Sequence, residues 1–143
     1  MLIYCDSSAL VKLIADEAES KALDQWLGEQ VEPHLVSTVL ARTEVLRAVR
    51  RCGDEMLTKA TELLDSLSIV ELEAGLADAA GSQDPPSLRS LDAIHLASAQ
   101  RLGTALAAFV AYDARLVQAA EALRLTVVQP GVHPTPTGEE QEG

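Results

Sequence analysis

LIYCDSSALVKL, residues 2–13, is the segment that decides the fold class of this chain. Its first four residues favour a strand, and the residues after Asp6 follow the apolar spacing of a helix that the two adjacent serines can cap. Asp6 is therefore expected at the carboxyl end of a strand, where open parallel sheets bind their ligands. By itself such an acid is more often a turn or cap residue. Its importance depends on which other acids converge on it.

The rest of the chain continues this alternation of helices and short strands. Helices are predicted over residues 17–28, 38–51, 54–67, 73–80, 90–102 and 114–123, and strands over residues 33–37, 69–72, 107–111 and 126–128. Ser37 or Thr38 is expected to cap the helix that runs to residue 51. Strands separated by helices imply an α/β fold with helices on both faces of a mainly parallel sheet of four or five strands. The segment 90–102 is apolar on nearly every side and is expected to be a central, buried helix.

One domain is expected over residues 1–129, followed by a disordered acidic tail over residues 130–143. The tail is rich in Pro, Gly, Thr and Glu, a composition that cannot bury enough apolar surface to fold. No apolar run in the sequence approaches the ~18 residues of a membrane span. Cys5 and Cys52 show neither metal-ligand spacing nor a disulfide framework. A cytoplasmic protein without membrane contact is expected.

The charge balance restricts the function classes further. The chain has 22 acidic residues against 11 Lys and Arg, a formal net charge of −11. Such a protein repels nucleic acid unless a local basic patch or bound cations reverse the field, which argues against a simple nucleic-acid-binding module. Four of the eleven cations fall in the single helix predicted over 38–51, namely Arg42, Arg47, Arg50 and Arg51. A metal-dependent enzyme or a protein with a basic partner remains compatible with this charge.

Three further acids stand where they can share one crevice with Asp6. Glu44 borders the apolar arc of its predicted helix, Asp92 lies in the first turn of the buried helix, and Asp113 follows an apolar strand as Asp6 does. Each has a structural explanation of its own: a solvated surface acid, an acid favoured by the helix dipole, and an N-cap. The joint pattern favours a functional cluster over four separate structural roles.

Clustered carboxylates need a counter-charge, because two unit charges ~4 Å apart repel by about 4 kcal/mol at an effective dielectric of ~20. An all-oxygen donor set without paired Cys or His suits Mg²⁺ or Mn²⁺ far better than Zn²⁺. His95 lies one helical turn after Asp92. It is interpreted as a packed, hydrogen-bonded side chain rather than a metal ligand, since hard cations prefer oxygen.

Four segments carry a resemblance to a known family: LIYCDSSAL with Asp6, TEVLRAVRR with Glu44, LRSLDAIHLA with Asp92 and AYDARL with Asp113. In order and approximate spacing they resemble the four motifs of PIN-domain ribonucleases, in particular VapC-type toxins of toxin–antitoxin pairs. The resemblance covers residues 2 to about 128. It implies a three-layer α/β/α PIN-like domain and endonucleolytic cleavage of RNA by the four acids. The strongly acidic balance departs from what an RNA-binding surface needs.

The resemblance also implies roles for individual residues and partners. Asp6, Asp92 and Asp113 would hold Mg²⁺ or Mn²⁺ directly or through water, and Glu44 would hold a second metal or orient the nucleophile. The neighbours expected to assist are Ser7 beside the first acid, and Arg89 and Arg115 as phosphate contacts, with salt bridges to the acids as the equal alternative for both arginines. A homodimer, a cognate antitoxin and a toxin–antitoxin hetero-oligomer are implied as well.

Other classes that begin with a strand ending in Asp fit less well. A phosphatase of the haloacid dehalogenase type needs a second Asp two residues later, where Ser8 stands. A receiver domain needs adjacent acids near the first strand end and a Lys after a late strand, and neither is present. Two alternatives stay open: a stand-alone PIN-like RNA-processing nuclease and a non-catalytic PIN-like interaction domain, the second disfavoured by the presence of all four acids.

Overall fold

The structure, a computed structural model, describes residues 1–133. Within these residues one sheet has the strand order β3-β2-β1-β4-β5, and every strand pairing in it is parallel. The strands are β1 Leu2–Cys5, β2 His34–Thr38, β3 Ser68–Val70, β4 Leu106–Val110 and β5 Val127–Val128. The predicted parallel sheet is therefore confirmed, at five strands. The central strand β1 and its neighbour β4 are the ones that lead into Asp6 and Asp113.

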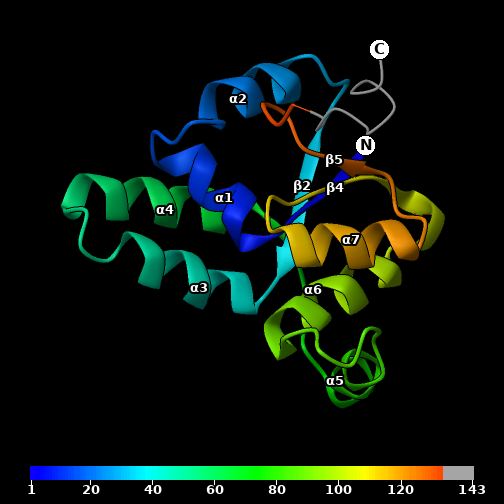
Figure 1. Cartoon of the computed structure of the whole chain (residues 1–143). Helices are drawn as coiled ribbons and strands as arrows, with labels where there is room; N and C mark the ends of the chain where they lie inside the picture. The colour runs from blue at the N-terminus through cyan, green and yellow to red at the C-terminus, as the bar shows by residue number, and fades with distance from the viewer. Residues whose placement is uncertain (134–143) are drawn as a thin grey trace, which may run out of the picture.

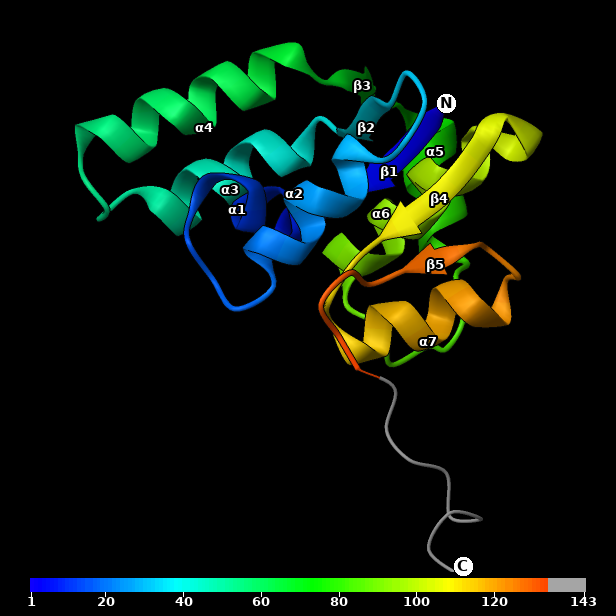
Figure 2. The same cartoon turned by 90° about the horizontal axis from the view of Figure 1, so that it is seen from above.

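Helices cover both faces of this sheet (Figures 1 and 2). They are α1 Ser7–Ile14, α2 Ser20–Gly28, α3 Leu40–Val49, α4 Asp54–Ser66, α5 Ala74–Gly81, α6 Ser90–Arg101 and α7 Ala114–Ala122, with a short 3-10 turn at Gly103–Ala105. One apolar core joins α1 to α4 with Ile3 and Cys5 of β1, and a second joins α6 and α7 with Tyr4. This alternation along β1 follows from the two-residue period of a strand. The predicted three-layer α/β/α architecture is confirmed.

Three details of the helices differ from the sequence prediction. The serines do not cap α1, because Asp6 is the N-cap and its Oδ1 accepts from the Ala9 amide at 2.9 Å. No side chain caps α3; Ser37 instead donates to the Cys5 carbonyl oxygen at 2.7 Å, within the sheet. The expected burial of α6 holds along its middle, where His95 to Ala99 are all buried, but not at its first turn, where Leu91 is 44% exposed. Local preference cannot distinguish such cases, because the same residue types form caps and tertiary hydrogen bonds.

The carboxyl end of the described chain is anchored near the edge of the sheet. The Tyr112 hydroxyl donates to the Pro130 carbonyl oxygen at 2.8 Å, so the first residue of the predicted tail contacts the domain. Residues 134–143, the remainder of that tail, lie outside the described residues. Nowhere in residues 1–133 is there a helix long and apolar enough to cross a membrane.

Candidate active site

The carboxyl ends of β1 and β4 bring the predicted acids of these two strands to the same edge of the sheet. Cys5 pairs with Val110 in register, and the Asp6 amide donates to the Val110 carbonyl oxygen at 3.1 Å. Asp6 therefore lies beside the last residue of β4. Asp113 follows β4 after a short link and begins α7. Parallel pairing thus places the two strand-end acids at the crevice where this class of sheet binds ligands.

Both of these acids also cap the helix that follows them. Asp6 accepts from the amide of Ala9, and Oδ1 of Asp113 accepts from the amides of Arg115 and Leu116 at 3.0 Å each. Capping fixes the position of each carboxyl group and uses one of its two oxygens. In residues 1–133 the second oxygen of each group accepts no protein hydrogen bond. A cap and a ligand-binding role are therefore compatible in the same side chain.

A chain of hydrogen bonds that starts in the core holds Glu44. Its Oε1 accepts from the Ser7 hydroxyl at 2.7 Å and lies 2.9 Å from Nε2 of His95. The other ring nitrogen, Nδ1 of His95, lies 2.8 Å from the Tyr4 hydroxyl. This arrangement suits the tautomer in which Nε2–H donates to Glu44 and Nδ1 accepts from Tyr4. His95 is 2% exposed, so the prediction of a packed, hydrogen-bonded histidine is confirmed.

Burial and hydrogen bonds shift the pKa values of Asp6 and Glu44 in opposite directions. Burial raises the pKa of Asp6, and the charge of Glu44 adds to the rise, although His95, the Ser8 hydroxyl and the Ala9 amide oppose it. Partial burial would also raise the pKa of Glu44, but the hydrogen bonds from His95 and Ser7 lower it below its usual value. Glu44 is therefore the readily ionised member of this pair.

The two remaining acids share a pocket at the mouth of the site. A hollow of about 290 Å³ is lined by Arg89, Asp92, Asp113, Ala114 and Arg115. The pKa of Asp92 is raised by partial burial and then by the charge of Asp113, with His95 and Arg89 opposing. Within residues 1–133 neither Arg89 nor Arg115 forms a salt bridge, so the salt-bridge alternative for these arginines is not found there. Both arginines border the acids, and their role as phosphate contacts stays a prediction.

Comparison with known proteins identifies the family. The chain matches the PIN domain family over residues 3–122. This chain belongs to the PIN-domain family. Ribonuclease VapC35 of Mycobacterium tuberculosis is 46% identical to it over 132 residues, 91% of this chain and 98% of the relative. The PIN fold seen here is thus accompanied by extensive sequence similarity to a VapC protein.

Two solved structures show the same fold at low sequence identity. VapC20 of Mycobacterium tuberculosis, described as a Sarcin-Ricin loop cleaving toxin, gives a TM-score of 0.69 at 18% identity, covering 92% of this chain and 99% of that one. A toxin-antitoxin complex from Klebsiella pneumoniae gives 0.65 at 16% identity, with coverage of 92% and 99%. At these identities the likeness concerns the fold.

The acids of this PIN domain fit a hard divalent cation by their chemistry. Among the described residues no three Asp, Glu, His or Cys side chains are grouped closely enough to hold a metal ion. Mg²⁺ is commonly held by one or two carboxylates, with waters and substrate phosphates completing its shell, so a closed protein cage is not required. The raised pKa values of Asp6 and Asp92 reflect burial and neighbouring negative charge, which a bound cation would offset.

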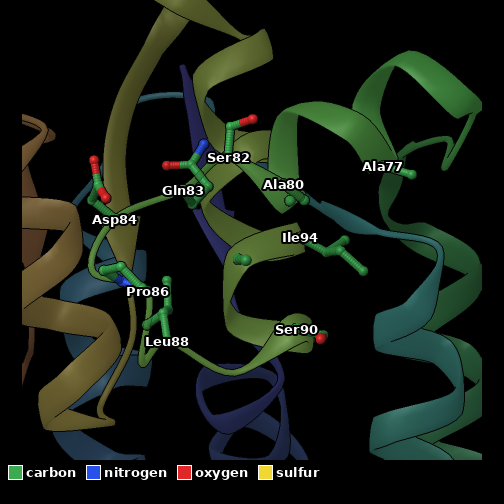
Figure 3. A pocket seen from close by; sticks show the side chains of 11 residues that line it. Ala77, Ala80, Ser82, Gln83, Asp84, Pro86, Leu88, Ser90 and Ile94 are labelled. Carbon is green, nitrogen blue, oxygen red and sulfur yellow. The ribbon is translucent and has the colours of Figure 1, made fainter.

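A larger pocket of the PIN domain lies away from these acids. It has a volume of about 490 Å³ and is lined by α5, the start of α6 and the loop between them. Figure 3 shows small and apolar side chains such as Ala80 and Ile94 around it, with Asp84 as the one acid among its lining residues. It includes none of the four predicted site residues. With a single acid in its lining, this pocket lacks the group of carboxylates found at the carboxyl edge of the sheet.

Two residues of the site were missed by the sequence analysis. Tyr4 was assigned only to a strand, yet its hydroxyl reaches His95 from the face of β1 opposite Ile3 and Cys5. Ser8 donates to Oδ1 of Asp6 at 2.7 Å and accepts from the Tyr112 amide at 3.2 Å. Ser8 therefore links the two strand ends. Its position two residues after Asp6 is a signal for a local hydrogen bond that the sequence did offer.

Proposed function

We propose that this PIN domain is a VapC-type endoribonuclease, the toxin of a toxin–antitoxin pair, that hydrolyses RNA phosphodiester bonds with Mg²⁺ or Mn²⁺. The observation that supports it most is the coupling of Asp6, Glu44, Asp92 and Asp113 at the carboxyl edge of the parallel sheet. The 46% identity to Ribonuclease VapC35 supports the choice of RNA as substrate.

The four acids would have different roles in hydrolysis. A bound divalent cation would supply a water of lowered pKa and neutralise charge on the phosphate. Asp6, Asp92 and Asp113 would hold that cation directly or through water. Hydrogen bonds from Ser7 and His95 lower the pKa of Glu44 despite its partial burial, so the ionised carboxylate can orient the attacking water or hold a second cation.

The arginines at the mouth of the site would position the substrate. Arg89 and Arg115 border the acids without forming a salt bridge in the described part of the chain. A guanidinium group binds phosphate oxygens through two parallel hydrogen bonds. These two side chains would therefore hold the phosphates next to the scissile bond and offset repulsion by the acids.

The proposed partners follow from the same site and from the fold. The acidic crevice suits a basic antitoxin segment, whose Arg or Lys would replace the charge of the cation among Asp6, Asp92 and Asp113. Likeness to the Klebsiella pneumoniae toxin-antitoxin complex supports a protein of that kind as partner. A homodimer, or a hetero-oligomer with the antitoxin, acting in the cytoplasm completes the proposal. A neighbouring reading frame for a DNA-binding protein with a basic tail would distinguish a toxin from a stand-alone nuclease.

Cleavage by the purified protein tests the catalytic proposal. RNA should be cut in the presence of Mg²⁺ or Mn²⁺, and cleavage should stop in excess EDTA and return when the metal is restored. Asp92→Asn, which keeps the size of the side chain, should be inactive under all three conditions. Undiminished cleavage in excess EDTA would contradict the metal mechanism, and cleavage retained by Asp92→Asn would contradict the assignment of the acids.

A further inference from the structure

Three arginines gather at the end of α3 and in the turn after it, on a chain whose net charge is −11. Arg47, Arg50 and Arg51 are exposed, and together with Ala48 they line a hollow of about 480 Å³. Among residues 1–133 none of the three forms a salt bridge with an acid. The surface therefore holds concentrated positive charge that the described carboxylates leave unneutralised.

Arg47 and Ala48 of this hollow lie near the side of α3 that carries Glu44, whereas Arg50, at the end of the helix, is about 120° from Glu44 around the axis. With 3.6 residues per turn, Arg47 and Ala48 lie about 60° and about 40° to either side of Glu44 around the helix axis. The buried side of α3 is elsewhere, centred on Val45 about 100° away. At a rise of about 1.5 Å per residue, the hollow begins about 4–5 Å from Glu44 along the axis. A strand bound at the acids can continue into the hollow along one helix.

We propose that Arg47, Arg50 and Arg51 bind backbone phosphates of the RNA strand on one side of the scissile bond. This inference rests on the proposed ribonuclease activity and assigns it a second substrate contact. The acid crevice and the overall charge repel RNA, so a local basic surface is needed to retain the strand. Guanidinium groups bind phosphate in a planar, two-bond geometry, and phosphate contacts carry no base preference.

The lining of the hollow favours RNA over an acidic protein. Protein interfaces are enriched in aromatic residues, Met and Arg, and their buried cores are mostly apolar. Ala48 is the one apolar residue of the hollow, and its other three lining residues are arginines. Such a surface offers charge and hydrogen-bond donors without an apolar anchor, which suits a phosphate backbone.

Salt-dependent RNA binding tests the cluster. The parent protein carries Asp92→Asn, so that a single-stranded RNA is bound without being cut. Arg47→Gln, Arg50→Gln and Arg51→Gln together should reduce the slope of log affinity against log salt by about 2, from about 0.7 for each of three phosphate contacts. The control triple is Lys21→Gln, Lys59→Gln and Arg124→Gln, which removes the same charge from dispersed, exposed positions. Its slope should stay close to that of the parent.

The outcomes separate this inference from the proposed function. Equal salt slopes for the two triple variants would overturn the inference. That result is also expected if the cluster binds an acidic protein instead of RNA. Wild-type protein that neither binds nor cuts RNA would overturn the proposed function itself. In the cleavage-competent protein the arginine triple should raise KM and leave kcat nearly unchanged. If the triple variant does not fold, each single Arg→Gln variant should lower the slope by about 0.7, and unchanged slopes in all three would contradict the inference.

Discussion

The four acids form an inner and an outer half that are held in different ways. In the inner half, Asp6 is 4% exposed and Glu44 is fixed by hydrogen bonds that reach back to His95 in the core. In the outer half, Asp113 is exposed and Asp92 is partly exposed, both beside a hollow open to solvent. The inner half therefore has fixed geometry before any ligand arrives, whereas in the outer half only Asp113 is held, by its cap, and Asp92 can adjust to a ligand. Substitutions should affect the two halves unequally.

Asp6→Asn should produce the largest change, by abolishing cleavage while stabilising the protein in EDTA. The amide oxygen of Asn can keep the bonds from Ser8 and the Ala9 amide, and Asn caps a helix about as well as Asp. The variant removes a buried negative charge near Glu44, which should stabilise the fold by about 1–2 kcal/mol at pH 7. Mg²⁺ or Mn²⁺ should then raise the melting temperature less than in wild type.

The pH dependence of that stabilisation has a defined sign. Because burial raises the pKa of Asp6 in the folded state, ionisation of this carboxyl group disfavours folding. The cost is absent well below the unfolded pKa of about 3.9 and grows as pH rises through the folded value. Melting curves of wild type and Asp6→Asn in EDTA should therefore coincide most closely near pH 4 and diverge toward pH 7. Parallel curves, with RNA cleavage retained, would leave Asp6 only a cap.

Tyr4→Phe tests whether the inner half depends on its connection to the core. The change removes the hydroxyl that lies 2.8 Å from His95 and leaves the buried ring nitrogen without a partner. An unsatisfied buried polar group costs about 1–3 kcal/mol, so the free energy of unfolding should fall by that amount. Phe109→Leu is the control, since Phe109 stacks on Tyr4 in the same core and makes no contribution to the hydrogen-bond chain.

Activity distinguishes the two core variants. Tyr4→Phe should lower kcat more than Phe109→Leu at equal loss of stability, because only the first loosens the ring that fixes Glu44. Equal effects on kcat would mean that the hydrogen-bond chain supports the fold alone.

Asp113 offers the matching test of the outer half, with a smaller effect on stability. Asp113→Ala should cost about 1 kcal/mol, because the cap on the Arg115 and Leu116 amides is lost. Asp113→Asn should be nearly neutral for stability, since its amide oxygen caps equally well, yet it should reduce RNA cleavage. Thermal melting and cleavage of the two variants separate the cap from the catalytic role. If Asp113→Asn cleaves RNA like wild type, Asp113 is a cap alone.

The order of strands and helices was predictable because it depends on neighbours in the sequence. Local apolar patterns and turn chemistry predict that a strand leads into Asp6 and a helix follows it. They also predict the strand that precedes Asp113. The pairing of Tyr4 with His95 spans 91 residues and that of Ser7 with Glu44 spans 37, so no local pattern reveals it. The orientation of the inner half was accordingly missed, although Asp6 and Glu44 were both named as candidates.

The capping residue of α1 was left open between Asp6 and the two serines for a related reason. Asp and Ser have nearly equal preference for the N-cap position, so the sequence around residue 6 does not decide between them. In the structure the pairing of β1 with β4 fixes where the strand ends, and this assigns the cap to Asp6. Because Ser8 is not the cap, its hydroxyl donates to Oδ1 of Asp6 and accepts from the Tyr112 amide. Tertiary contacts, rather than residue preference, settled the assignment.

Ser7→Ala should produce the smallest effect, and its pH dependence identifies what the hydroxyl does. Ser7 donates to Oε1 of Glu44 at 2.7 Å and helps to lower the pKa of that acid. Glu44 is partly exposed and water can replace the lost donor, so the variant should lose only about 0.5 kcal/mol at pH 7. A lowered folded pKa contributes stability above the unfolded value of about 4.3, and that contribution disappears as pH falls through the folded pKa. The difference in melting temperature between wild type and Ser7→Ala should therefore stay nearly constant from pH 7 to about pH 5 and shrink as the pH falls below about 4.3. A difference that does not shrink below that pH would show that Ser7 contributes packing rather than a bond to the ionised carboxylate.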